Sequence, residues 1–236
     1  MQGIRKSAAA LLNTLYPSVC LNCHTRIEEQ KLWLCGSCYD KLNPLPEQHC
    51  PKCGIPNEAD ECDNCAVNGY VFTQAVSVFL YEGPAKSLVH ALKYQGLHTV
   101  SGWFANRMFI AAQMEPEIMQ ADCLTAVPLH RVRHRERGYN QSELIAAQLA
   151  KKMSKPLLKK ALTRRINTGT QTQLHAAARR TNLLDAFVSG KDDVSGKSVL
   201  LIDDVFTTGT TVNEAAKVLL KAGATKVYVM TACHGL

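Results

Sequence analysis

Four C-x-x-C pairs lie close together near the start of the chain, and they limit what this part of the chain can fold into. They use eight of the ten cysteines, within 46 residues, as Cys20/Cys23, Cys35/Cys38, Cys50/Cys53 and Cys62/Cys65. Two residues between thiolates let one tight turn present both sulfurs to one ion, and two such turns complete a tetrahedral zinc site. Because residues 17–68 contain few apolar runs, we expect metal binding to supply much of their folding energy.

The spacing of the pairs favours two structural zinc ions over other uses of cysteine. Redox C-x-x-C motifs occur singly, and iron–sulfur motifs have tighter runs of cysteines. Eight thiolates leave no coordination position open for water, so the sites are expected to be structural. Eleven residues separate the first two pairs and eight the last two, which suits a zinc ribbon in each half. Sequential pairing is favoured over interleaved pairing, which the spacing does not exclude.

The remainder of the chain alternates between strand-like and helix-like segments. Strands are expected at 75–81, 123–127, 198–202 and 226–232, and helices at 86–94, 101–114, 141–153 and 212–222. This alternation predicts an α/β fold with a parallel sheet flanked by helices, in which ligands bind at the carboxyl ends of the strands. We therefore expect two domains: residues 1–68, a cysteine module preceded by a short amphipathic helix, and residues 69–236, the α/β domain.

Charge is unevenly distributed along the chain. Residues 131–180 hold thirteen Lys or Arg and two acids, a net +11, whereas the rest of the chain has a net charge of −4. Such a block indicates a polyanionic ligand, with a solvated helix face as the alternative. No apolar run approaches the length of about 20 residues that spans a bilayer, and no secretory signal is evident. We therefore expect a cytoplasmic protein without membrane insertion.

The most specific motif begins with the apolar run Val199–Ile202 and continues as Asp-Asp-Val-Phe-Thr-Thr-Gly-Thr-Thr to Thr211. Two carboxylates at the end of a strand can accept hydrogen bonds from the vicinal hydroxyls of a ribose. A turn rich in hydroxyls and backbone N–H groups, followed by a helix N-terminus, suits a phosphate. The motif lacks the lysine of a Walker P-loop and the three glycines of a dinucleotide site. A strand, turn and helix with capping threonines is the simpler alternative.

This segment resembles the signature of type I phosphoribosyltransferases. The resemblance implies that the paired acids bind the ribose hydroxyls and the turn binds the 5′-phosphate of phosphoribosyl diphosphate, which is used with Mg²⁺. The residues implied are Asp203, Asp204, Thr207, Thr208, Gly209, Thr210 and Thr211. Phe206 departs from the smaller aliphatic residue found in many members of that family.

Further stretches narrow the resemblance. Val-Pro-Leu-His at 127–130, Arg-Gly-Tyr-Asn-Gln at 137–141, the motifs between Arg164 and Phe187, and the four cysteine pairs all resemble the ComF family. This likeness covers nearly the whole chain. It implies a double zinc ribbon before a phosphoribosyltransferase-like domain, and a role in handling incoming single-stranded DNA during natural transformation or the use of DNA as a nutrient.

The basic residues after the strand at 123–127 are expected to contact a diphosphate or a nucleic acid. By position they match the loop that holds diphosphate in phosphoribosyltransferases, although a solvated arginine loop would have the same composition. The residues concerned are Arg131, Arg135, Arg137, Gly138 and Asn140. Residues 163–182 resemble the hood loop that closes over substrate in those enzymes, with a disordered linker as the alternative.

Three functions remain open at this point. The protein could transfer a phosphoribosyl group, or bind phosphoribosyl diphosphate or a DNA 5′-phosphate end without turnover, or sense the diphosphate as a regulator. No residue identifies an acceptor base. Expected partners are phosphoribosyl diphosphate, single-stranded DNA, and proteins of DNA uptake or recombination.

Overall fold

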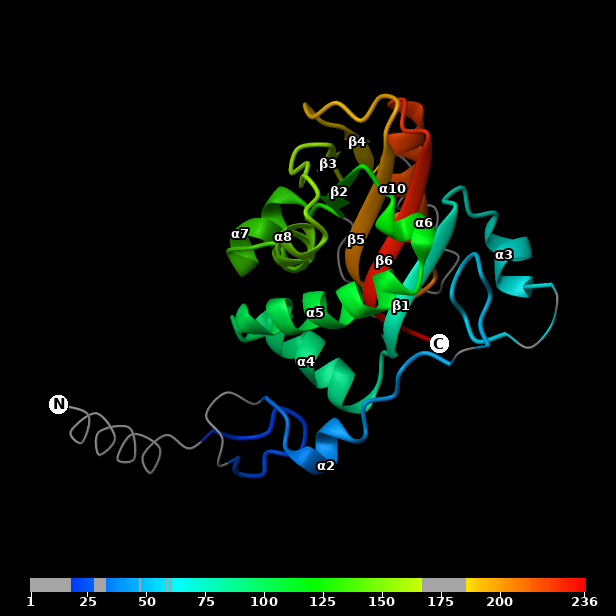
Figure 1. Ribbon diagram of the computed structural model, residues 1–236. Helices are drawn as coiled ribbons and strands as arrows, with labels where there is room; N and C mark the ends of the chain where they lie inside the picture. The colour runs from blue at the N-terminus through cyan, green and yellow to red at the C-terminus, as the bar shows by residue number, and fades with distance from the viewer. Residues whose placement is uncertain (1–17, 28–32, 47, 58, 60, 167–185) are drawn as a thin grey trace.

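A four-stranded parallel sheet forms the centre of the protein (Figure 1). The computed structural model describes residues 18–27, 33–46, 48–57, 59, 61–166 and 186–236. The strand order is β1-β6-β5-β2, and the strands comprise β1 (Gln74–Leu80), β2 (Cys123–Ala126), β5 (Ser198–Phe206) and β6 (Lys226–His234). This arrangement confirms the predicted parallel sheet.

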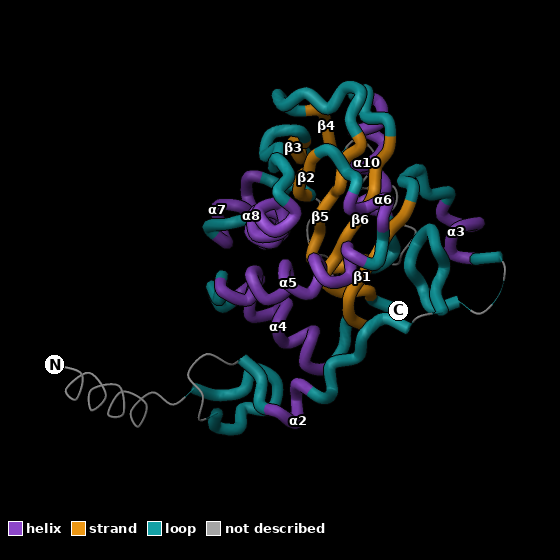
Figure 2. The backbone as a smooth tube through the Cα atoms, viewed as in Figure 1, coloured by secondary structure: helices purple, strands orange, loops and turns teal. Residues whose placement is uncertain are grey.

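Helices and a small second sheet cover the two faces of this sheet (Figure 2). One face packs against α4 (Gly83–Tyr94), α5 (Thr99–Gln113) and α8 (Gln141–Met153). The other packs against α10 (Thr210–Lys221) and an antiparallel pair, β3 (Leu162–Arg164) and β4 (Phe187–Ser189). Short helices are α2 (Gly36–Tyr39), α3 (Asp63–Asn68), α6 (Pro116–Met119) and α7 (Arg131–Arg137).

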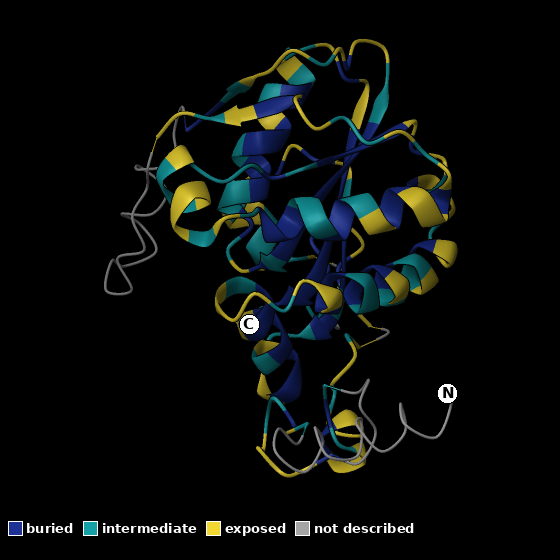
Figure 3. Ribbon diagram, turned by 90° about the vertical axis from the view of Figure 1, so that its left-hand side faces the viewer, coloured by how far each residue is buried: buried dark blue, intermediate teal, exposed yellow. Residues whose placement is uncertain are grey.

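Burial on both faces explains why the central strand is a continuous apolar run rather than an alternating one. In β5, Leu200 and Ile202 enter the core beneath α8, whereas Val199 and Leu201 enter the core beneath α10. All four side chains are fully buried. Figure 3 shows the buried residues in dark blue, gathered in the interior between the outer helices.

Several element boundaries differ from those expected. β5 continues to Phe206, so the paired acids lie inside the strand rather than after it, because β6 runs beside it as far as His234. The helix α10 begins at Thr210, inside the threonine turn. Residues 131–137, interpreted from the sequence as a loop, form the helix α7 instead. The expected N-terminal helix lies outside the described residues, as does most of the expected hood.

The two cysteine clusters attach to different parts of the α/β core. Cys20 and Cys38 belong to the core on the α4 side, whereas Cys50 and Cys53 belong to the core on the α10 side. The segment between the clusters runs along the edge strand β1. There Leu45 N donates to Val78 O and Leu80 N donates to Asn43 O, both at 2.9 Å. Within the described residues, no helix has the length and apolar character needed to cross a bilayer.

Candidate functional site

The eight cysteines form two clusters that have the geometry of zinc sites. The ligand sulfurs within each cluster lie within 4.8 Å of one another, and the clusters follow the order of the sequence, as the sequential pairing predicts: Cys20, Cys23, Cys35 and Cys38, then Cys50, Cys53, Cys62 and Cys65. Three of the Sγ–Sγ distances are 3.6 Å. A tetrahedron with Zn–S bonds of about 2.3 Å has edges of about 3.8 Å. Both clusters therefore fit a structural zinc ion.

The carboxylate of Asp203 is buried and held by neighbouring donors. Its Oδ1 accepts from Ser142 Oγ at 2.7 Å and from the backbone N–H of Asp204 at 2.9 Å. Burial, followed by the charge of Asp204, raises the pKa of Asp203 to about 7. A carboxyl group with this pKa changes its charge near neutral pH, which is common in binding and catalytic sites.

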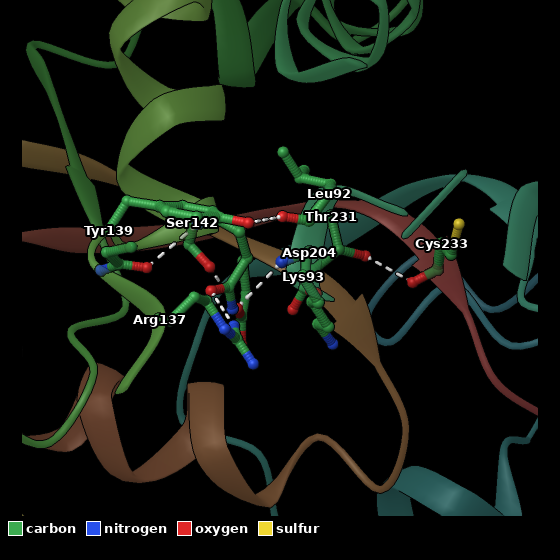
Figure 4. Close-up of polar contacts among 11 residues, drawn as sticks. Leu92, Lys93, Arg137, Tyr139, Ser142, Asp204, Thr231 and Cys233 are labelled. Carbon is green, nitrogen blue, oxygen red and sulfur yellow. Dashed lines mark hydrogen bonds and ion pairs between the residues drawn. The ribbon is translucent and has the colours of Figure 1, made fainter. Parts of the chain in front are cut away.

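Asp204, next in the chain, forms an ion pair with a lysine from another element (Figure 4). Its Oδ2 lies 2.5 Å from Nζ of Lys93, the penultimate residue of α4. Burial lowers the pKa of Lys93. The charge of Asp204, the hydrogen bond between Asp204 and the lysine, and the charge of Asp203 raise it, and the net shift is upward. The lysine therefore stays charged and neutralises part of this acidic pair.

The threonine turn follows directly after β5. Gly209 has φ +68°, in the left-handed region, and acts as the N-cap of α10. Thr208 Oγ1 and Thr210 Oγ1 lie 2.8 Å apart, and Thr210 N is 3.5 Å from Thr208 Oγ1. For the backbone N–H groups of Thr208, Gly209 and Thr211, the described part of the chain provides no acceptor. These donors and the N-terminus of α10 have the character of an anion site.

The basic residues predicted to contact diphosphate lie on α7 and at its end. His130 begins this helix, since its Nδ1 accepts from Val132 N at 3.3 Å, and Gly138, at φ +80°, ends it. Arg131 and Arg135 are exposed. Arg137 is half-buried, donates to Gln141 Oε1, and lies 5.1 Å from the centre of the Tyr94 ring.

Asn140 is placed differently from the other residues of that group. It is buried, donates from Nδ2 to Val127 O at 3.0 Å, and accepts at Oδ1 from Ser142 N at 3.1 Å. These bonds make it the N-cap of α8. Its side chain thus fixes the start of the helix that brings Ser142 to Asp203.

Two functional side chains and one nearby arginine were not predicted from the sequence. Lys93 and Ser142 contact the acidic pair directly. Burial lowers the pKa of Arg164 in β3, and the nearby charge of Asp203 only partly offsets this effect. Ser142 follows a capping asparagine, which is a local signal, but Lys93 is 111 positions before Asp204 and has none.

A pocket of about 260 Å³ adjoins the ion pair. It is lined by Lys93 together with Tyr94, Gly96, Arg133, Glu136, Arg137 and Tyr139. Tyr139 is fixed by a hydrogen bond from its hydroxyl to Leu92 O (Figure 4). The pocket therefore joins the end of α4 to α7, with three cationic side chains around it.

The two cysteines outside the clusters are core residues, as predicted. Cys123 in β2 and Cys233 in β6 are buried, and burial raises the pKa of both thiols. A raised thiol pKa disfavours the reactive thiolate.

Comparison with known proteins gives matches to both parts of the chain. A double zinc ribbon domain matches residues 11–66, and a phosphoribosyl transferase domain matches residues 139–235. Competence protein F of Haemophilus influenzae is 30% identical over 217 residues, covering 89% of this chain and 94% of that protein. DNA utilization protein YhgH of Escherichia coli is 30% identical over 225 residues, covering 93% and 98%. Competence protein ComFC of Bacillus subtilis is 25% identical over 228 residues, covering 89% and 91%.

Proposed function

The chain belongs to the ComF family, that of competence protein F and YhgH, and we propose that it binds phosphoribosyl diphosphate with Mg²⁺ beside the carboxyl end of β5. The observation that carries the proposal is the adjacency of two buried carboxylates, Asp203 and Asp204, to the threonine turn 207–211 at the start of α10. Carboxylates accept hydrogen bonds from ribose hydroxyls, while the turn supplies donors to the 5′-phosphate.

Cationic side chains would complete this site on the diphosphate side. Lys93, Arg133 and Arg137 line the pocket beside the acidic pair, and Arg131 and Arg135 extend the positive charge along α7. Bound Mg²⁺ would neutralise part of the diphosphate charge. In this arrangement the protein would orient the ribose through its hydroxyls and its phosphate.

Isothermal titration calorimetry with phosphoribosyl diphosphate and Mg²⁺ tests the proposal. We expect binding to wild-type protein and its loss in the Asp203→Asn, Asp204→Asn double variant, because amides accept fewer hydrogen bonds than carboxylates. Asp193→Asn is a matched control, since Asp193 is exposed and lies in the loop before β5. Unchanged affinity in the folded double variant would refute the site.

We further propose a cytoplasmic role in handling internalised single-stranded DNA, as an element of competence or DNA utilisation. The support is family membership together with the exposed arginines of α7, which can contact a phosphate backbone. Ten cysteines without a disulfide among the described residues suit a reducing compartment. Partners of DNA uptake or recombination would meet the same basic surface.

A binding role without turnover is the second candidate, because the same turn could hold a nucleic-acid 5′-phosphate. Diphosphate release is measured with Mg²⁺, in the presence and absence of each of a panel of nucleobases, and release that depends on a base establishes phosphoribosyl transfer. A 5′-phosphorylated oligonucleotide is then compared with its 5′-hydroxyl counterpart. Tighter binding of the phosphorylated strand, with competition by phosphoribosyl diphosphate, favours the binding role.

A further inference from the structure

Tyr70 connects the second cysteine cluster to the threonine turn. This tyrosine follows α3 and is 4% exposed. Its hydroxyl donates to Thr208 O at 2.8 Å and accepts from Asn64 Nδ2 at 3.1 Å. Burial raises the pKa of Tyr70 to about 12, so the hydroxyl keeps the proton that it donates. One side chain thus bridges two segments 138 positions apart in the sequence.

Asn64 continues this connection to the metal ligands. It lies on α3 between Cys62 and Cys65, and its Nδ2 is also 3.5 Å from Cys53 Sγ. The two protons of one amide group can therefore serve a ligand sulfur and the Tyr70 hydroxyl at the same time. Hydrogen bonds run without a gap from the cluster through Asn64 and Tyr70 to the carbonyl of Thr208.

Packing around the tyrosine ring fixes the turn as well. A Cβ added to Gly209 would lie 2.5 Å from Phe206 Cζ and 2.7 Å from Tyr70 Cε1, so the turn rests directly on these rings. The Tyr70 ring stacks on Phe72 at a centroid distance of 4.8 Å. The next residue, Val71, donates its N–H to Asn213 Oδ1 in the first turn of α10 at 2.8 Å.

We propose that Tyr70 is a positioning residue through which the second cysteine cluster sets the conformation of the threonine turn and hence its anion affinity. The affinity part of this inference rests on the proposed function. The conformational part does not. Because coupling between two sites is reciprocal, a ligand on the turn should also tighten the binding of zinc at the second cluster.

Tyr70→Phe tests the link, since it removes the hydroxyl and keeps the ring in place. The matched control is Tyr228→Phe, a 3% exposed tyrosine in β6 whose hydroxyl donates to Glu117 Oε2 at 2.9 Å, away from the turn. The first readout is hydrogen exchange over residues 207–214, which include Asn213 N, the donor to Gly209 O at 2.9 Å. We expect faster exchange in Tyr70→Phe alone, with two zinc ions retained by both variants.

The second readout is affinity for phosphoribosyl diphosphate with Mg²⁺. Loss of one buried hydrogen bond predicts affinity about threefold to tenfold weaker in Tyr70→Phe, and wild-type affinity in Tyr228→Phe. Zinc affinity is measured by competition with a chromogenic chelator, with and without the same ligand. The ligand should tighten the binding of one ion in wild-type protein, and Tyr70→Phe should abolish that tightening.

Hydrogen exchange and ligand affinity together separate failure of this inference from failure of the proposed function. If zinc-loaded Tyr70→Phe shows wild-type exchange rates, the inference is overturned, whatever the affinity of that variant for phosphoribosyl diphosphate. Wild-type ligand affinity in that variant, with the exchange rates changed, overturns its affinity part. If wild-type protein binds no phosphoribosyl diphosphate, the proposed function fails, and hydrogen exchange still decides whether Tyr70 positions the turn.

Discussion

Each cysteine cluster consists of four cysteines, but the two clusters contact different parts of the site. The second cluster reaches the threonine turn directly through Asn64 and Tyr70. The first cluster contacts α4: Asn22 donates to Cys38 Sγ at 3.3 Å, and Ser87 Oγ donates to Asn22 Oδ1 at 3.0 Å. Ser87 lies on the helix that ends beside Lys93, the partner of Asp204.

This difference indicates that each of the two clusters stabilises a different end of the candidate site. Hydrogen bonds link the second cluster to the proposed phosphate side, whereas they link the first cluster to α4, the helix that carries Lys93. We therefore expect a disturbance of the second cluster to affect the threonine turn more than a disturbance of the first cluster affects the acidic pair. Four measurements can break or sharpen this comparison.

Removing one zinc ligand from each cluster should have the largest effect. Cys23→Ser and Cys62→Ser should each release one of two zinc ions and cost several kcal/mol of stability, because metal binding is the folding energy of such segments. Only Cys62→Ser should also abolish binding of phosphoribosyl diphosphate. Zinc analysis, calorimetric melting and ligand titration provide the measurements, and equal loss of binding in both variants would contradict this difference between the clusters.

Breaking the ion pair at the end of α4 should have the next largest effect. Lys93→Met leaves Asp204 buried without its partner, which costs about 3–5 kcal/mol in buried pairs. The control Lys217→Met removes a lysine that is 46% exposed and pairs with Glu214 on α10, and should cost less than about 1 kcal/mol. Urea unfolding measures both. Equal small losses would show that the lysine is not needed to neutralise the acidic pair.

The raised pKa of Asp203 predicts a pH effect that involves neither cluster. Since the folded-state pKa is about 7 and the ordinary value 3.8, the native state binds the proton more tightly, and stability falls as pH rises between these values. Asp203→Asn keeps an oxygen acceptor for Ser142 and removes this dependence. It should melt several degrees above wild type at pH 8 and close to it at pH 4. A difference in melting temperature between wild type and Asp203→Asn that stays constant from pH 4 to 8 would contradict the raised pKa of Asp203.

Ser87→Ala should have the smallest effect, because it removes one hydrogen bond between α4 and the first cluster. We expect a loss of about 1 kcal/mol and faster zinc release from one cluster, with ligand affinity unchanged. Ser101→Ala is the control, since its hydroxyl donates to His98 O at 2.6 Å on the neighbouring helix. Equal zinc release from both variants would show that Ser87 does not support the cluster.

The sequence predicted the parts of the fold that depend on local pattern. The cysteine clusters, the four parallel strands and the threonine turn follow from short spacings and apolar runs. The extension of β5 to Phe206 depends on its pairing with β6, and a contact between distant segments cannot be predicted from the local sequence pattern. Residues 131–137 were interpreted as a loop because their arginines suggested a ligand, although His130 and Gly138 have the character of a helix start and end.

The site was predicted less completely, because much of it consists of contacts between distant segments. Asp203, Asp204 and the turn were found as one motif. Lys93 and Tyr70 are single residues 111 and 138 positions from the atoms they contact, and no local pattern in the sequence assigns a role to either. Only the tertiary fold, which places the end of α4 and the residue Tyr70 after α3 beside the end of β5, brings them to the site.

Because residues 43–45 pair with β1, the cysteine-rich segment also covers an edge of the sheet, a role that is separate from metal binding. β1 is an outer strand of the sheet, and hydrogen bonds from Leu45 and to Asn43 occupy its free side. An open strand of this kind is a template for self-association. A shortened protein that starts after the last C-x-x-C pair would thus tend to form oligomers or precipitate, however well its α/β core folded.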